Sequence, residues 1–478
     1  MLKFDPGRED AFWADIERLP GYPRGEAIRL RRMLFAEDAV HRLPEVLRSV
    51  EAPEQVPLRV VMDGVPMRRG PEDLKPLVHS ILQASGWAVE AIIVEPDVSG
   101  QVHTDFEQIG RVQARLVPGC AVVAVGSGTI TDIAKHACHQ FEQATGDLVP
   151  FLAYQTANSV SAYTSNMAPI FVRGVKRTLP SRYPDALVCD LETLRDAPDA
   201  MTAAGVGDLL AAGVSFADWY LAFRLGMDDS YTPLAETLMG SLGEDMLELA
   251  PAVRRMDLEA MGTLARWIAL AGLAMSLAHA TTPLSGFEHV VSHVLDMQAD
   301  STGRPLATHG AQVALASALA SSAYAILLDE FDPFAIDPAR CFPDDATMHR
   351  RILSAFSAID PTGKAAEECW SEYSLKLQAW RAHQDVIGRQ WAAWPELRDS
   401  LQARAWAASR LWAILRAVGL PMDFGALTPP IQASEARYAF LNAHLIRRRF
   451  TVGDLLHFTG WDSETLWDRV SSGVHGEI

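Results

Sequence analysis

Several side chains in the second half of the chain could bind a divalent metal ion. Asp208 follows the glycine-rich stretch Gly205-Val-Gly207, where the sequence favours the start of a helix. His289 and His293 are four residues apart, so a helix would place both on one face. His309 opens an alanine-rich helical stretch. One aspartate with two histidines suits Zn²⁺ and similar ions, and three protein ligands leave open positions for a substrate oxygen, which is the catalytic pattern.

Each of these residues also has an ordinary structural interpretation. Asp208 could cap the N-terminus of a helix, a position that aspartate often occupies. His289 and His293 could be a hydrogen-bonded pair inside a helical core, and His309 could be a core or capping residue. Their separations in sequence are too long to form a motif, so the residues alone leave both interpretations open.

A second chemical feature is a glycine turn within residues 121–135. The apolar run Ala121-Val-Val-Ala-Val leads into Gly126-Ser-Gly128 and then into a predicted helix. In a parallel α/β sheet this order presents backbone N–H groups and a helix N-terminus to a phosphate. Glycine is needed there because a Cβ atom would hold the backbone away from the anion. The alternative is a strand-to-helix turn that binds nothing.

Length and composition limit the class of protein. The 478 residues exceed the usual size of one domain, so two domains are expected. The 42 basic and 60 acidic residues give a formal charge of −18, which argues against nucleic acid or an anionic membrane as partner. Five scattered cysteines without a Cys-x-x-Cys motif favour a reducing compartment.

The sequence also gives an expectation for location. The charged N-terminus lacks the apolar centre of a signal peptide. The longest apolar stretch, Trp267 to Ala278, is too short to cross a bilayer. We therefore expect a cytoplasmic protein without membrane insertion.

Strand and helix patterns alternate in the first half of the chain. Strands are predicted over residues 57–62, 89–94, 121–125, 150–154 and 186–190, helices over 71–86 and 106–116, and a hairpin over 168–179. Short strand–helix–strand connections imply parallel pairing. We predict an α/β dinucleotide-binding domain with a parallel, Rossmann-like sheet over residues 1–192, with a helical extension over about residues 1–50. An all-helical metal- and substrate-binding domain follows over residues 193–478.

Taken together, these segments resemble a known family. The stretch Gly126-Ser-Gly-Thr-Ile-Thr-Asp132-Ile-Ala-Lys135 resembles the Gly-Gly-Gly-x-x-x-Asp-x-x-Lys nucleotide loop of dehydroquinate synthase-like and metal-dependent alcohol dehydrogenases. Six further segments look like the sn-glycerol-1-phosphate dehydrogenase branch: residues 156–165, 174–180, 199–208, 285–289, 309–313 and 449–456. Their order and spacing are intact, and the resemblance implies a dehydroquinate synthase-like fold.

The resemblance implies a role for individual residues. The metal ion would be bound by Asp208, His289 and His309, and His293 would face the substrate. NAD or NADP would lie on the glycine turn and the loop beyond it, at Gly126, Ser127, Gly128, Thr129, Asp132, Thr156, Ser159 and Ser165. Asp63 could accept a hydrogen bond from the adenosine ribose or simply form a turn. We expect Zn²⁺ as the ion, with Ni²⁺ and Fe²⁺ as alternatives.

Two positions depart from the family pattern. Ser127 replaces the middle glycine, and a residue this small still permits the loop. The family reads Ser-x-Asp-Gly-Tyr where this chain has Ser159-Val-Ser161-Ala-Tyr163, so the aspartate that would contact the substrate is Ser161 here. This leaves the identity of the substrate in doubt. A phosphate on the substrate would need cations, for which the predicted hairpin offers Arg173, Lys176, Arg177 and Arg182.

The activity implied by the resemblance is NAD(P)H-dependent reduction of a small phosphorylated ketone. The family default is dihydroxyacetone phosphate, which gives sn-glycerol 1-phosphate. One alternative is a cyclase or lyase similar to dehydroquinate synthase, in which redox is transient and NAD is regenerated. Another is a catalytically silent member, against which the intact set of Asp208, His289 and His309 argues. We expect a homo-oligomer, with a dimer as the simplest form.

Overall fold

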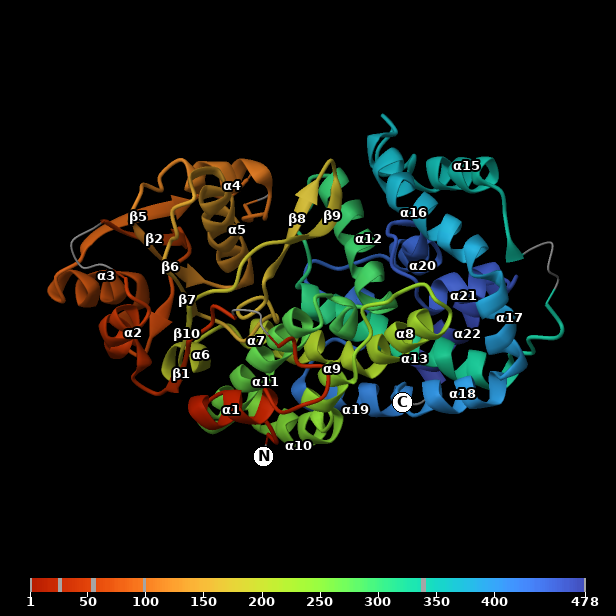
Figure 1. Cartoon of the computed structure of the whole chain (residues 1–478), viewed down its shortest axis with the longest axis horizontal. Coiled ribbons are helices and arrows are strands. Elements are labelled where there is room, and N and C mark those ends of the chain that lie inside the picture. The colour runs from red at the N-terminus through yellow and green to blue at the C-terminus, as the bar shows by residue number, and fades with distance from the viewer. Residues whose placement is uncertain (1, 25–27, 53–56, 98–99, 337–340, 477–478) are drawn as a thin grey trace. The chain divides into compact units, whose positions relative to one another are not determined.

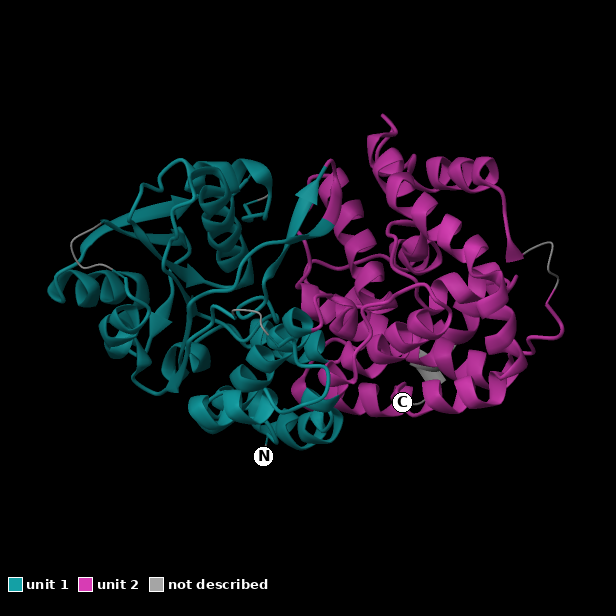
Figure 2. Ribbon diagram, in the orientation of Figure 1, with its two compact units in different colours: residues 1–172, 177–209, 237–277 teal, residues 173–176, 210–236, 278–478 magenta. Residues whose placement is uncertain are grey.

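The computed structural model describes residues 2–24, 28–52, 57–97, 100–336 and 341–476 (Figure 1). The chain forms two compact units (Figure 2). Unit 1 comprises residues 1–172, 177–209 and 237–277, and unit 2 comprises residues 173–176, 210–236 and 278–478. Each unit therefore contains more than one segment of the chain.

Unit 1 is built on a six-stranded parallel sheet in the order β1-β10-β7-β6-β2-β5. The strands are β1 Arg32–Ala36, β2 Pro57–Asp63, β5 Ala88–Val94, β6 Ala121–Gly126, β7 Phe151–Gln155 and β10 Ala186–Asp190. After β2 the chain adds β5 on one side and then β6 and β7 on the other. The direction of winding therefore reverses between β2 and β6, and open α/β sheets bind ligands at such a reversal, outside the carboxyl ends of the strands.

Helices cover both faces of this sheet (Figure 1). Every residue of β6 is buried, as expected for a central parallel strand. Val123 packs in one core with α2 (Leu43–Ser49) and α3 (Leu74–Ala84). Val122, pointing to the opposite face, packs in the other with α4 (Phe106–Gln113) and α5 (Gly128–Thr145).

All the predicted strands of the first half form, including the hairpin of β8 (Met167–Val172) and β9 (Val175–Pro180). The prediction of a helical extension over about residues 1–50 is wrong at residues 32–36. These residues form β1, which pairs in parallel with β10 at the edge of the sheet, next to α1 (Glu9–Ile16) and α2 in sequence. A five-residue strand that begins with an arginine and follows another has no strong local signal, and its pairing with β10 decides its conformation.

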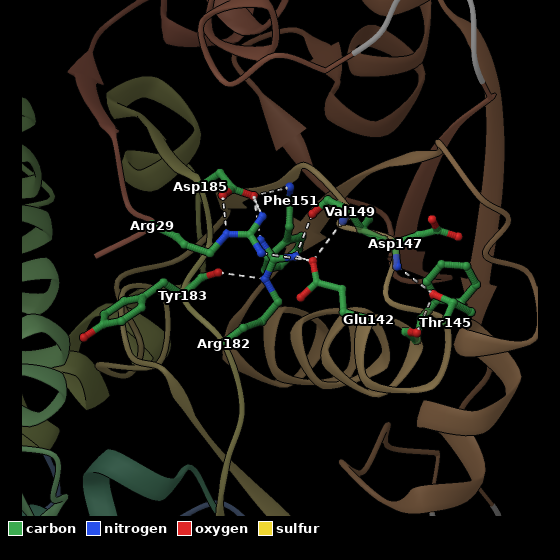
Figure 3. Close-up of polar contacts among 10 residues, drawn as sticks. Arg29, Glu142, Thr145, Asp147, Val149, Phe151, Arg182, Tyr183 and Asp185 are labelled. Carbon is green, nitrogen blue, oxygen red and sulfur yellow. Dashed lines mark hydrogen bonds and ion pairs between the residues drawn. The ribbon is translucent and has the colours of Figure 1, made fainter. Parts of the chain in front are cut away.

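A buried ion network joins the amino ends of β7 and β10 (Figure 3). Asp185, just before β10, accepts hydrogen bonds from the backbone N–H of Phe151 at 2.8 Å and from Arg182 Nη2 at 2.6 Å. Arg29 Nε donates to the same carboxylate at 3.0 Å, and Glu142 on α5 binds both arginines. The network lies at the amino ends of the strands, whereas the glycine turn lies at their carboxyl ends. Arg182 is therefore no longer a candidate for binding a substrate phosphate.

Unit 2 is built of helices. Among its central helices are α8 (Ala212–Arg224), α12 (Phe287–Ser301) and α13 (His309–Glu330), which pack against one another. Around them lie α15 Asp345–Phe356, α16 Lys364–Ala382, α17 Gln384–Ala392, α18 Trp394–Gln402, α19 Ala408–Val418, α20 Ala433–Asn442, α21 Val452–Phe458 and α22 Ser463–Gly476. Helix α9 (Pro233–Leu238) begins in the unit 2 segment that ends at Glu236 and ends in the unit 1 segment that begins at Thr237.

The change from strands to helices occurs where the sequence places it, since β10 ends at Asp190. The compact units divide the chain differently from the predicted boundary at residue 192. Three helices beyond that point belong to unit 1: α7 Asp199–Leu209, α10 Leu242–Arg254 and α11 Leu258–Leu277. Helix α6 (Leu191–Arg195), which spans the predicted boundary, belongs to unit 1 as well.

Among the residues that the structure describes, three helical stretches are long and apolar enough to cross a membrane by length and composition: Asp199–Arg224, Leu258–Leu277 and His309–Glu330. Between 78% and 89% of the most apolar window of each is buried inside the structure. These windows therefore serve as core helices in this fold.

Candidate active site

The carboxyl ends of three strands meet at the glycine turn. The β2–β6 and β6–β7 registers bring Asp63, Gly126 and Gln155 to the same edge of the sheet. Helix α5 begins at Gly128 directly after β6 and runs for 18 residues. The N–H groups of its first turn therefore face this edge and can bind a phosphate. The predicted nucleotide turn thus lies at the reversal point of the sheet.

Both glycines of the turn are required by close packing. A Cβ atom at Gly126 would lie 2.5 Å from Cβ of Ile130, on the first turn of α5. A Cβ atom at Gly128 would overlap Cγ2 of Val160, in the next loop. Ser127 occupies the N-cap position of α5 with φ −78°, a conformation open to any residue, so the serine is compatible with the turn.

Asp132 and Lys135 form a buried ion pair on α5, with 2.7 Å between Lys135 Nζ and Asp132 Oδ1. Lys135 Nζ also donates a hydrogen bond to the backbone carbonyl of Ala162 at 3.0 Å. The pair therefore anchors the loop of residues 156–165 to the helix. The cofactor contacts of Asp132 and Thr129 stay predictions.

Asp63 is the last residue of β2 and has protein partners. Its Oδ1 lies 2.5 Å from Lys75 Nζ and accepts the backbone N–H of Val65 at 2.9 Å. The second contact is the turn geometry that aspartate commonly forms. The structure thus bears out the turn, and the ribose contact of Asp63 stays a prediction.

The polar groups in the loop of residues 156–165 form hydrogen bonds with one another and with neighbouring backbone. Tyr163 Oη donates to the carbonyl of Ala157 at 2.7 Å and lies 3.3 Å from Ser159 Oγ. Ser165 Oγ accepts the backbone N–H of Met167 at 3.1 Å, and the N–H of Thr156 donates to the carbonyl of Gly126 at 3.2 Å. The loop is therefore fixed directly to the end of β6.

Asp208 lies near the C-terminal end of α7, so the N-cap interpretation is wrong. Its Oδ2 accepts two hydrogen bonds from Ser161, one from the backbone N–H and one from Oγ, both at 3.0 Å. Gly205 permits this approach of helix and loop, because a Cβ atom there would overlap the carbonyl oxygen of Asn158. Ser161 thus contacts the side chain of a predicted metal ligand.

His289, on α12, is held by a buried carboxylate. Its Nδ1 lies 3.0 Å from Oε1 of Glu288, which also accepts the N–H of Gly286 at 2.6 Å. An ionised carboxylate can only accept hydrogen bonds, so Nδ1 carries the hydrogen and Nε2 keeps a lone pair. Metal-binding histidines are typically oriented in this way.

His309, the first residue of α13, has a defined hydrogen-bond direction too. Gln312 Nε2 donates to Asp296 Oδ1 at 3.0 Å, so the amide oxygen of Gln312 faces Ser292. Ser292 Oγ donates to that oxygen at 3.2 Å and lies 3.0 Å from His309 Nδ1. The one hydroxyl hydrogen of Ser292 is used in this bond, so His309 Nδ1 must carry a hydrogen and donate it to Ser292 Oγ. The lone pair of the His309 ring is therefore again on Nε2.

These three side chains come together. One ligand atom from each of Asp208, His289 and His309 lies within 4.8 Å of the other two. Ligand atoms bound at about 2.1 Å from an ion are separated by up to about 4 Å, so small side-chain movements suffice. The donor set and its oriented histidines therefore fit a divalent ion.

His293, one turn after His289 on α12, has a different partner. Its Nδ1 lies 2.7 Å from Arg447 Nη2, which also donates to the carbonyl of Lys176 at 2.8 Å. Burial, and then the charges of Arg447 and Lys176, lower the pKa of His293 well below its ordinary value. The ring is therefore neutral. Lys176 Nζ lies 2.8 Å from Asp296 Oδ2, and its predicted substrate contact stays a prediction.

Sequence reasoning missed the residues that orient the histidines. Arg447 stands within the run Arg447-Arg-Arg449, and Glu288, Ser292 and Gln312 are single polar residues inside helical patterns. Only the i, i+3 spacing of Ser292 from His289 and of Gln312 from His309 could have suggested these two residues.

Comparison with known proteins defines the class first. Residues 34–198 match the family model described as iron-containing alcohol dehydrogenase. A solved structure of the iron-containing alcohol dehydrogenase from Thermococcus thioreducens is 14% identical, with 94% of this chain and 100% of that chain covered and a TM-score of 0.54. The chain has the fold of the iron-containing alcohol dehydrogenases, as the sequence predicts.

Curated relatives define the family. Glycerol-1-phosphate dehydrogenase [NAD(P)+] of Thermofilum pendens is 30% identical over 297 residues, which are 61% of this chain and 77% of that protein. The protein of the same name from Bacillus subtilis is 33% identical over 258 residues, 53% of this chain and 64% of its own length. The chain belongs to the glycerol-1-phosphate dehydrogenase family. It spans less than two thirds of the length of the Bacillus relatives.

Replacing Ser161 by alanine should lower metal affinity about 10-fold. The variant loses the Oγ bond to Asp208 and keeps the backbone N–H bond, and partners that orient a metal ligand commonly contribute 10–100-fold in affinity. Titration of the metal-free protein with Zn²⁺ measures the change. Ser301→Ala, at an exposed position on α12, is the control and should bind as the unchanged protein does. Equal affinities of the Ser161→Ala and unchanged proteins would contradict the orienting role.

Proposed function

We propose that the protein is a metal-dependent NAD(P)H dehydrogenase that reduces a small phosphorylated ketone. The family default is the reduction of dihydroxyacetone phosphate to sn-glycerol 1-phosphate. The observation that carries the proposal is the convergence of Asp208, His289 and His309 within 4.8 Å, with the two histidines oriented as ligands. A divalent ion held by these residues would supply a Lewis acid for a carbonyl oxygen.

The residues of the chain have distinct tasks in this proposal. The glycine turn and the first turn of α5 bind the pyrophosphate through backbone N–H groups. The nicotinamide of the bound dinucleotide supplies the hydride. Ser161 and Glu288 orient Asp208 and His289. His293 faces the substrate oxygen, and His293 or a bound water provides the proton that completes the alcohol.

The finer assignments are part of the proposal. Zn²⁺ is the expected ion, and Ni²⁺ or Fe²⁺ suits the same ligand set. The relatives are named for both NAD and NADP, and Asp63 is the residue that would favour NAD through its ribose contact. We propose a cytoplasmic homo-oligomer, with a dimer as the simplest form.

The direct test is an assay of NADH and NADPH oxidation by the purified chain after loading with each metal. Dihydroxyacetone phosphate is the substrate and unphosphorylated dihydroxyacetone is the matched control. We expect metal-dependent oxidation with the phosphorylated ketone and much less with the control. NAD⁺-dependent turnover without net reduction would place the protein with the cyclases and lyases. No turnover with any metal or either cofactor would contradict the proposal.

A second variant tests substrate identity. Ser161→Asp restores the family carboxylate, and it should raise activity on dihydroxyacetone phosphate if this loop serves another ketone in the unchanged protein. An unchanged or lower activity would mean that position 161 serves Asp208 instead, because two adjacent carboxylates repel each other in the absence of the ion.

A further inference from the structure

We infer that Arg447 is a positioning residue that makes His293 a neutral hydrogen-bond donor and keeps it from becoming a metal ligand. The inference rests on the proposed function and concerns unit 2 alone. Three histidine rings lie together there: the ring centres of His289 and His309 are 5.1 Å apart, and that of His293 is 5.7 Å from His309. Proximity alone would allow any of them to bind the ion.

The partner behind each ring separates the three histidines. The Glu288 carboxylate accepts from Nδ1 of His289, and Ser292 accepts from Nδ1 of His309. Both rings therefore hold their hydrogen on Nδ1 and offer the Nε2 lone pair, which is the form that binds a metal.

Nδ1 of His293 lies next to a hydrogen-bond donor, whereas Nδ1 of His289 and Nδ1 of His309 each lie next to an acceptor. A guanidinium group has five N–H donors and no lone pair to accept with. With Arg447 Nη2 at 2.7 Å, Nδ1 of His293 must accept, so the ring carries its hydrogen on Nε2. Neither nitrogen then offers a free lone pair to an ion. Nε2–H is available to an electron-rich oxygen of the substrate.

Arg447 is itself fixed in place. Its side chain is buried, and the same Nη2 donates to the backbone carbonyl of Lys176 at 2.8 Å. Lys176 in turn binds Asp296, the residue at the start of the hydrogen-bond chain through Gln312. Arg447, which donates to His293, and Ser292, which accepts from His309, thus belong to one connected hydrogen-bond network.

This arrangement assigns a specific role to His293 in the proposed reduction. Its Nε2–H stabilises the negative charge that develops on the substrate oxygen, and it retains the hydrogen throughout. The proton that completes the alcohol then comes from water. A ring that donates without being deprotonated is a fixed dipole, and such donors stabilise charge best when they are already oriented.

The test uses the full chain with ¹⁵N-labelled histidine, whose ring nitrogens give different NMR shifts with and without hydrogen. His293→Gln identifies the His293 signals by their disappearance. We expect bare Nδ1 and protonated Nε2 in the metal-free protein, and a shifted Nδ1 signal in Arg447→Met. In the loaded enzyme, Arg447→Met should lower kcat about 100-fold with little change in KM, because an oriented donor to the developing charge is lost, and Arg447→Lys, which keeps a donor, should recover most of it.

Arg448→Met is the matched control, because Arg448 is the exposed neighbour in sequence; it should behave as the unchanged protein does. Hydrogen on Nδ1 of His293, or a His293 signal unaffected in both Arg447 variants, would overturn the inference. Failure of the unchanged enzyme to reduce any ketone would refute the proposed function instead, since the NMR measurement requires no turnover.

Discussion

Replacing His309 by alanine should remove the bound metal and lower turnover at least about 10³-fold, while dinucleotide affinity stays nearly unchanged. The variant deletes one of three protein ligands, and the stabilisation that an ion gives to developing charge amounts to several kcal/mol. The glycine turn belongs to unit 1 and His309 to unit 2, so the phosphate contacts do not depend on this imidazole. Elemental analysis, the NAD(P)H oxidation assay and NADH fluorescence titration measure the three quantities.

The control for this experiment is His41→Ala, which removes an exposed histidine from the short helix Ala39–Arg42 of unit 1. It should retain metal, turnover and dinucleotide affinity. Full activity in His309→Ala would show that the ligand assignment is wrong. Loss of dinucleotide affinity together with metal would show that the two sites are not independent.

Gly205→Ala should lower the free energy of unfolding by about 3 kcal/mol, at the upper end of the usual cost of overpacking. The added methyl group would overlap the carbonyl oxygen of Asn158, and both α7 and the loop would have to separate because the clash involves backbone. Asp208 follows on the same helix, so metal affinity should fall as well. Urea unfolding and Zn²⁺ titration measure the two effects.

A glycine in open space provides the matched control. Gly110 lies within α4, and a Cβ atom built there meets no atom within 4 Å apart from its chain neighbours and the backbone of its own helix. Gly110→Ala should therefore be neutral or stabilise by about 0.4–1 kcal/mol, since alanine restricts the unfolded chain. Equal stability of the Gly205 and Gly110 variants would mean that helix and loop are less tightly packed than the structure shows.

The sequence predicts the sheet well because its central strands carry local signals. β6 is a continuous apolar run ended by glycines, and the helix after it has its own periodicity. β1 escapes prediction because it begins with Arg32 directly after Arg31, and only pairing with β10 makes it a strand. The units could not be predicted either, since α10 and α11 join unit 1 through contacts between residues distant in sequence.

The candidate site, too, could be predicted from the sequence only in part. Family resemblance identifies Asp208, His289 and His309, whose residue types and spacing are distinctive. The partners that orient them could not be predicted, because a serine or glutamine inside a helix has no pattern that indicates its hydrogen-bond direction. Arg447 becomes interpretable only when folding brings it to His293 across 154 positions of sequence.

The loop of residues 156–165 has a consequence for how the protein assembles with its two ligands. Val160 lies against the start of α5 at Gly128, and the next residue, Ser161, holds the carboxylate of Asp208. Any change in cation affinity that dinucleotide binding causes through this strip of backbone must be matched by an equal change in dinucleotide affinity when the cation binds, because linkage between two sites is reciprocal. Attempts to exchange NAD for NADP by redesigning the loop would thereby also retune the cation affinity.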